Sequence, residues 1–391
     1  MKKLPRHISW WPESGALAPI PFLDGLRAVA VVLTILFHAW WGIPGVGVPA
    51  QDAELFPINY ARTGVHLFFV LSGFLLFLPY ARWIFGLQQR PSSAKFYLRR
   101  VLRVGPAYWA CLLVLSLSGL SDPAVVKDIV VHILFLSNAF QHSIYSINGV
   151  FWTMAIEVQF YVFLPLIALL MWRISFLGLR IALPLVVLGL FGVSSVVGYM
   201  DTHHHIHSLT VSTFLTGETS LLHWLDVFGD GIVCGLLYVY ITQVAQCKPD
   251  ALYPVAILSF ATGITILLLI TFAPRMHALQ IKGILIGMCY AAILFGLLFG
   301  PSMMRRPFAS VPLRFVGLIS YSMYLWHTIV IGWIEPHLTS FSPHMRVTLG
   351  FILGFLLSIP VAYLSYQLTE RPFFAARKRA HEQVISPARG Y

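Results

Sequence analysis

The chain has 391 residues, of which 58% are hydrophobic and only 10% are charged. Soluble domains have roughly 45–50% apolar and about 25% charged residues, so this composition excludes a water-soluble globular protein. The formal net charge is +11. We attribute it to basic residues on the cytoplasmic face and to contact with anionic lipids rather than to nucleic-acid binding.

Apolar stretches of the length that a membrane span needs, about 20 residues, recur along almost the whole chain. Ten spans are predicted, at 22–42, 63–86, 104–121, 151–172, 179–199, 227–245, 252–273, 282–300, 313–334 and 347–369. The stretch 129–140 is too short to cross and predicts a re-entrant or interfacial helix. The predicted fold class is all-α: a polytopic membrane protein with about ten transmembrane helices plus short interfacial or re-entrant helices.

The basic residues predict the orientation of these spans. Most of the 26 Lys and Arg residues fall in the two tails and in alternate loops, which predicts that both termini are cytoplasmic. We expect three parts: a cytoplasmic tail at 1–21, a membrane domain at 22–373 and a basic cytoplasmic tail at 374–391. No small-residue cleavage site closes the first apolar run, so this run is predicted to be a retained span.

The first span carries two ionisable residues, Arg27 and His38, in LDGLRAVAVVLTILFHAWW. Their spacing places them on one helical face, about 16 Å apart along the axis, with His38 predicted well inside the membrane. A guanidinium near the cytoplasmic side could hold phosphate, and a neutral imidazole could accept a proton from a hydroxyl. The alternative is that Arg27 reaches the interface and His38 bonds to a neighbouring helix.

Two further segments place polar groups near the membrane. Arg99, Arg100 and Arg103 lie on a short helix that leads into the third span, and they could serve as a topology signal or bind phosphates. The fourth span buries Glu157, with a hydroxyl at Thr153 and a phenol at Tyr161 on the same face. A carboxylate at this depth needs a cationic or histidine partner, or must be protonated.

Other polar residues in the spans admit simpler readings. His66 lies near the external mouth, and Ser72 is read as a close-packing residue as readily as a substrate contact. Tyr321 and His327 in the ninth span are candidates for lining the substrate path. Glu370 is predicted to form a helix-terminal pair with its neighbour, Arg371.

No metal site is predicted. The external loop has four nearby histidines, His203, His204, His205 and His207, but lacks the carboxylates or helical spacing that a metal site needs. The four cysteines are scattered singly, which favours packing roles over a disulfide framework.

Six collinear motifs between residues 22 and 373 resemble the acyltransferase-3 family of integral-membrane acyltransferases. They are LDGLRA followed by His38, GVxLFFVLSGFL at 64–75, FYxRRxxRxxPxYW at 96–109, FWTMxxExxFYxFLP at 151–165, ISYSxYLWH at 319–327 and YxxxExP at 366–372. The chain departs from the family at His66, where an Asp or another polar residue is common. No esterase-like domain follows residue 373, so a stand-alone form is expected.

This resemblance implies transfer of an acyl group, usually acetyl, from cytoplasmic acyl-coenzyme A. The implied acceptor is a hydroxyl of an envelope polysaccharide, a lipid-linked glycan or a glycosylated small molecule. It further implies that Arg27 and His38 are the essential pair and that Arg100 and Arg103 contact the donor. The expected site is in a bacterial inner membrane, with no permanently bound cofactor, and the sequence leaves the oligomeric state open.

We therefore expect His38 to be the general base, Arg27 to act with the basic segment on the donor, and Glu157 to orient His38 or bind sugar hydroxyls. His66, Ser72, Tyr161, Tyr321 and His327 are expected to line the substrate path. A direct transfer and a covalent relay remain open. The rival hypotheses are a transporter or flippase for a glycan or lipid, and a scaffold or sensor that has lost activity.

Overall fold

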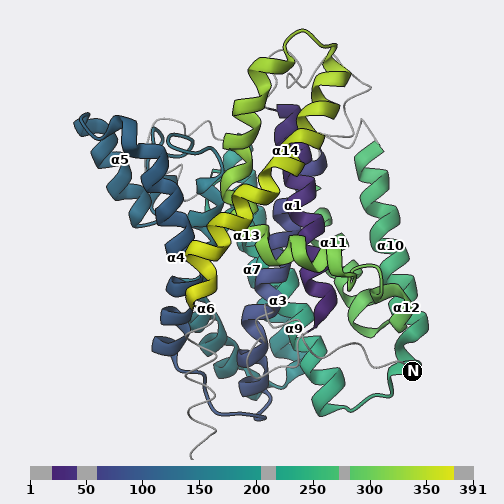
Figure 1. Cartoon of the computed structure of the whole chain (residues 1–391). Helices are drawn as coiled ribbons and strands as arrows, with labels where there is room; N and C mark the ends of the chain where they lie inside the picture. Colours follow the sequence, from purple (N-terminus) through teal and green to yellow (C-terminus); the bar gives the residue numbers. More distant parts are fainter. Residues whose placement is uncertain (1–19, 42–59, 204–216, 273–281, 374–391) are drawn as a thin grey trace, which may run out of the picture.

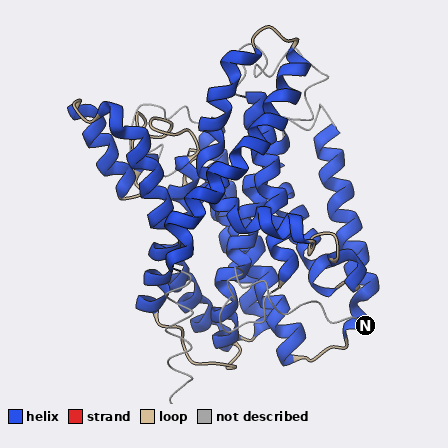
Figure 2. Ribbon diagram, viewed as in Figure 1, coloured by secondary structure: helices blue, strands red, loops and turns tan. Residues whose placement is uncertain are grey.

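The computed structural model describes residues 20–41, 60–203, 217–272 and 282–373, and these segments contain helices and loops without strands (Figure 2). The predicted tails, apart from residues 20 and 21, lie outside the described residues, and so do His204, His205 and His207. Within these segments, seven helices are long and apolar enough to cross a membrane. The prediction of an all-α polytopic membrane protein is therefore confirmed.

Each of the ten predicted spans overlaps one helix, and the seven helices that are long and apolar enough to cross are among these ten. The helices are α1 (Pro21–Trp41), α3 (Gly64–Ile84), α4 (Ser93–Ser116), α6 (Phe151–Ile174), α7 (Leu179–His203), α9 (Leu225–Val239), α10 (Tyr253–Phe272), α11 (Lys282–Phe299), α13 (Val311–Ile334) and α14 (Pro343–Ser365). Short π-helical turns extend α9 through Tyr240–Val244 and α14 through Tyr366–Glu370. A one-turn helix, α12 (Ser302–Arg305), precedes α13.

Two boundaries differ from the prediction. The basic segment and the third span form one continuous helix, α4. The helix runs through Pro106, although a proline inside a helix removes one backbone hydrogen bond. The predicted stretch 129–140 is replaced by α5 (Pro123–Ile133), whose first turn is capped by Asp122 and begins with proline. With 11 residues, α5 is too short to cross, as predicted.

Helix α1 lies in the middle of the bundle, packed on α13, α14 and α3 (Figure 1). Helix α3 packs in turn on α9 and α6. Helix α10 lies at the edge of the bundle, where only 17% of its apolar stretch is buried. Helices α3 and α9 approach each other closely: a β-carbon at Gly231 would collide with the backbone of Val70 and Gly73. Gly73 is thus a close-packing residue, as small residues in membrane helices commonly are.

Candidate active site

Two histidines from distant parts of the chain meet at one end of α1. The Nδ1 atom of His38 lies 3.1 Å from Nε2 of His327 on α13, and 2.9 Å from the carbonyl oxygen of Thr34. His327 is fully buried, and its own Nδ1 lies 2.8 Å from the carbonyl oxygen of Tyr324. His38 is therefore bonded to a neighbouring helix, as the alternative reading expected.

His38 stands in the last turn of α1, which ends at Trp41, within one residue of the predicted end of this span. Its partner His327 lies inside α13, seven residues before that helix ends at Ile334. The depth of His38 in the membrane stays a prediction. Arg27 lies in the second turn of α1, close to the opposite end.

A cavity of about 50 Å³ lies between α1, α3, α6 and α13. Its polar lining comprises Arg27, Ser72, Thr153, Glu157, Tyr321 and Tyr324, and its apolar lining includes Phe68 and Met154. One water needs roughly 10–15 Å³ on this measure, so the cavity has room for about three to five waters. Tyr324 connects this cavity to the histidine pair, because its ring faces the cavity while its carbonyl oxygen holds His327.

Glu157 is the carboxylate of this cavity. Its Oε1 atom accepts hydrogen bonds from the Ser72 hydroxyl at 2.9 Å and from the Tyr161 hydroxyl at 2.6 Å. The predicted face of α6 is thus formed, although Thr153 bonds instead to the Tyr324 hydroxyl at 2.6 Å. The hypothesis that Glu157 orients His38 is wrong, because the side chain that contacts His38 is His327.

Arg27 faces this cavity from α1. Its charge is repelled by that of Arg103 and attracted by those of Asp24 and Glu157, yet its Nε atom is buried and has no hydrogen-bond partner among the described residues. No ion pair within 4.0 Å involves Arg27 in the described part of the chain. A buried guanidinium without an ion-pair partner is suited to bind an anionic group of a ligand.

The three arginines of α4 have different surroundings. Arg99 is exposed and bonds to the carbonyl oxygen of Lys95 in its own helix. Arg100 lies over the ring of Tyr161, with its guanidinium carbon 6.0 Å from the ring centroid. Arg103 forms an ion pair with Glu370 at 2.9 Å. Arg100 and Arg103 therefore face the cavity side of the bundle and Arg99 does not.

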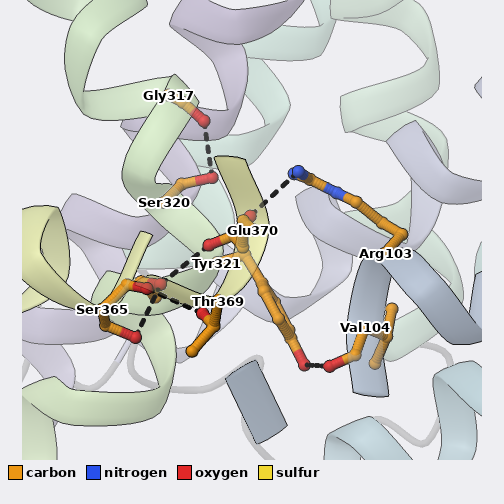
Figure 3. A network of polar contacts seen from close by, with 9 residues as sticks. Arg103, Val104, Gly317, Ser320, Tyr321, Ser365, Thr369 and Glu370 are labelled. Atoms are coloured by element: carbon orange, nitrogen blue, oxygen red, sulfur yellow. Dashed lines mark hydrogen bonds and ion pairs between the residues drawn. The ribbon is translucent and has the colours of Figure 1, made fainter. Parts of the chain in front are cut away.

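Glu370 anchors a buried network at this end of the site (Figure 3). One carboxylate oxygen pairs with Arg103 and the other accepts from the Ser322 hydroxyl at 2.7 Å. The predicted pair between Glu370 and Arg371 is wrong: Arg371 donates to Gln367 on the exposed side, while the π-helical turn directs Glu370 inward.

The remaining predicted residues have structural partners. The Tyr321 hydroxyl donates to the carbonyl oxygen of Val104 at 2.7 Å, which joins α13 to α4 (Figure 3). His66 is buried, with its ring edge-on to Trp224 at 4.8 Å between centroids, so it does not line the cavity. Among the described residues no cluster of three or more potential metal ligands occurs.

Sequence reasoning missed two buried carboxylates on α9. Asp226 and Asp230 are 3% and 6% exposed, and each has one buried oxygen without a hydrogen-bond partner among the described residues. The cost of an ionisable residue inside a span was the signal that could have found them, since both lie in the predicted span 227–245 or at its edge.

Comparisons with known proteins agree with this architecture. The sequence profile of the Acyl_transf_3 family, described as an acyltransferase domain, matches residues 20–366. The chain is 26% identical over 385 residues to the O-acetyltransferase OatA of Staphylococcus aureus, covering 90% of this chain and 57% of that protein. It is 26% identical over 390 residues to the peptidoglycan O-acetyltransferase OatA of Listeria monocytogenes, covering 90% and 55%. The chain thus spans little more than half of these relatives, and no solved structure matches it.

Proposed function

Because the chain belongs to the acyltransferase-3 family, we propose that it transfers an acetyl group from acyl-coenzyme A to a hydroxyl of a cell-envelope carbohydrate. The names of the two relatives support this acceptor, since both are O-acetyltransferases and one acts on peptidoglycan. The donor is a co-substrate, and the reaction itself requires no permanently bound cofactor.

The observation that carries this proposal is the arrangement of α1. The Arg27 guanidinium faces the cavity and has no ion-pair partner within 4.0 Å among the described residues. At the other end of α1, the His38 imidazole contacts His327 on α13. The two groups are about 16 Å apart along the axis. This separation suits a long donor that has phosphates at one end and a thioester at the other.

The reaction follows from the chemistry of these groups. His38 takes the proton from the acceptor hydroxyl as its oxygen attacks the thioester carbonyl. The tetrahedral intermediate then collapses, the carbon–sulfur bond breaks, and the departing thiolate takes the proton from His38. An ester and a free thiol are formed, with no net change in protons. Arg27 and Arg100 supply positive charge for the phosphates of the donor.

The basic residues support an orientation in which the Arg27 end of α1 faces the cytoplasm of a bacterium and both termini are cytoplasmic. The His38 end then lies near the external face of the inner membrane, where envelope carbohydrates are found. The cavity of about 50 Å³ is far smaller than the roughly 300–1,000 Å³ of ligand pockets. Helices around it must therefore separate when the donor enters.

Glu157 lines the cavity at the Arg27 end of the proposed substrate path. It fixes Ser72 and Tyr161 through its Oε1 atom and lies close enough to Arg27 for their charges to interact. We assign it to positioning Arg27 and to binding a polar group of the substrate that enters the cavity. This assignment replaces direct contact with His38.

The test uses the protein in lipid nanodiscs with acetyl-coenzyme A, labelled in the acetyl group, and soluble peptidoglycan fragments. Free thiol and acetyl ester on the fragments are measured in parallel, and equal amounts of both are expected. Thiol release without ester formation, or neither product, would refute the proposal. A transporter would form no ester.

A matched pair of variants tests the donor site. Arg27→Gln is expected to raise the KM for acetyl-coenzyme A, because the anion loses a buried charge-assisted contact worth about 1.5–3 kcal/mol. Arg62→Gln removes a half-exposed arginine that pairs with Glu218 and is expected to leave KM unchanged. Equal KM values in both variants would exclude Arg27 from donor binding.

A further inference from the structure

We infer that His327 is a positioning residue that keeps the Nε2 atom of His38 unprotonated and therefore able to act as the base. The inference rests on the proposed function and adds to it a second histidine. It changes the role expected for His327, from lining the substrate path to acting through His38.

The protonation state of His327 follows from its neighbours. Its Nδ1 atom lies 2.8 Å from the carbonyl oxygen of Tyr324 and 3.2 Å from that of Met323. Carbonyl oxygens only accept hydrogen bonds, so Nδ1 of His327 must carry the hydrogen. In a neutral imidazole the other nitrogen then has a free lone pair. This nitrogen, Nε2, is the atom that faces His38.

The state of His38 follows in the same way. Its Nδ1 atom faces two acceptors, the carbonyl oxygen of Thr34 at 2.9 Å and the lone pair of His327 Nε2 at 3.1 Å. A lone pair on Nδ1 would be repelled by both, so Nδ1 carries the hydrogen. The Nε2 atom of His38 is left with its lone pair, which is the form that accepts a proton.

The same contacts serve the charged intermediate. When Nε2 of His38 takes a proton, the ring becomes a cation whose Nδ1–H still points at two acceptors. Hydrogen bonds from a charged donor are roughly twice as strong as neutral ones, and they count for more where water is excluded. His327 therefore stabilises the protonated base without having a charge of its own.

The backbone around His327 is fixed independently of the substrate. The Asn148 side chain donates to the carbonyl oxygen of Leu325 at 3.0 Å, and its oxygen accepts from the Thr328 hydroxyl at 3.0 Å. These contacts hold the turn of α13 that presents His327. A rigid partner is what a positioning residue requires.

The test compares two replacements of His327 in nanodiscs, with acetyl-coenzyme A and peptidoglycan fragments as probes. His327→Gln retains an acceptor oxygen near the position of Nε2, and His327→Leu has none. We expect kcat to fall about 100-fold in His327→Leu, within the range for loss of general-base help, and less than tenfold in His327→Gln, with KM unchanged in both. Equal kcat in the two variants would refute the inference.

A matched control is available in the short 3-10 turn Glu335–Leu338, which follows α13. The His337 ring also contacts a carbonyl oxygen one turn back, that of Trp333 at 3.1 Å, but it is exposed. His337→Leu is expected to retain full activity. If wild-type protein forms ester and His327→Leu matches it, the inference fails while the proposed function stands.

A measurement without substrate tests the inference even if the probes are not turned over. Solid-state NMR of protein labelled with ¹⁵N-histidine, in bilayers, detects which ring nitrogen carries hydrogen. His38→Ala and His327→Leu assign the two signals. Hydrogen on Nδ1 of His38 and a nitrogen–nitrogen coupling to His327 are expected. Hydrogen on Nε2 of neutral His38 would overturn the inference.

Discussion

Replacing Glu370 with leucine removes the carboxylate that lies 2.9 Å from Arg103. The Glu370 side chain is fully buried and that of Arg103 is 19% exposed, so the variant takes the carboxylate away from a largely buried cation. Removing one member of a buried pair costs roughly 3–5 kcal/mol. Because Arg103 retains some access to solvent, we expect a loss near the lower limit, about 3 kcal/mol.

The free energy of unfolding in mixed detergent micelles measures this loss, and two further variants make it specific. The double variant Arg103→Leu with Glu370→Leu should recover most of the stability, because the buried cation is removed together with its carboxylate. Arg371→Leu removes the exposed neighbour that bonds to Gln367 and should change stability by less than about 0.5 kcal/mol. A double variant no more stable than Glu370→Leu would refute the reasoning.

Two other predictions concern packing and pH. Gly231→Ala should lower the melting temperature, because the added β-carbon would collide with the backbone of Val70. Gly189→Ala has open space around its β-carbon and should be neutral or stabilising, since alanine is the better helix former. Equal shifts of the melting temperature in the two variants would contradict the α3–α9 contact. Burial lowers the pKa of His132, on α5, below its usual 6.5. The fold therefore holds His132 neutral and loses stability as pH falls below about 6.5. His132→Gln should reduce the loss of melting temperature between pH 7.5 and 5.5, and an unchanged loss would count against it.

The helices could be predicted because each is a long apolar run, and the hydrocarbon requires every backbone group to be bonded within its own segment. The predicted helix boundaries were less accurate where charged residues occur within a long helix. The arginines of α4 interrupt hydrophobicity without interrupting the helix, so the start of that helix was placed too late.

The grouping of side chains was only partly predictable. Spacing along one helix predicted that Glu157 and Tyr161 share a face, and they are hydrogen-bonded. Predicting contacts between helices requires knowing which helices are neighbours, and the hydropathy of the sequence does not contain this information. The His38–His327 contact joins α1 to α13, and the Arg103–Glu370 pair joins α4 to the end of α14; neither could be found from a local pattern.

The central claim is that His38 is the base for transfer of an acetyl group to a carbohydrate hydroxyl. A single-turnover measurement in nanodiscs, following acetyl ester on peptidoglycan fragments with wild-type protein and His38→Ala, tests it most directly. We expect the rate to fall by roughly 10²–10⁴-fold, while the melting temperature and the affinity for acetyl-coenzyme A stay unchanged. Ester formation at the same rate in both proteins would contradict it.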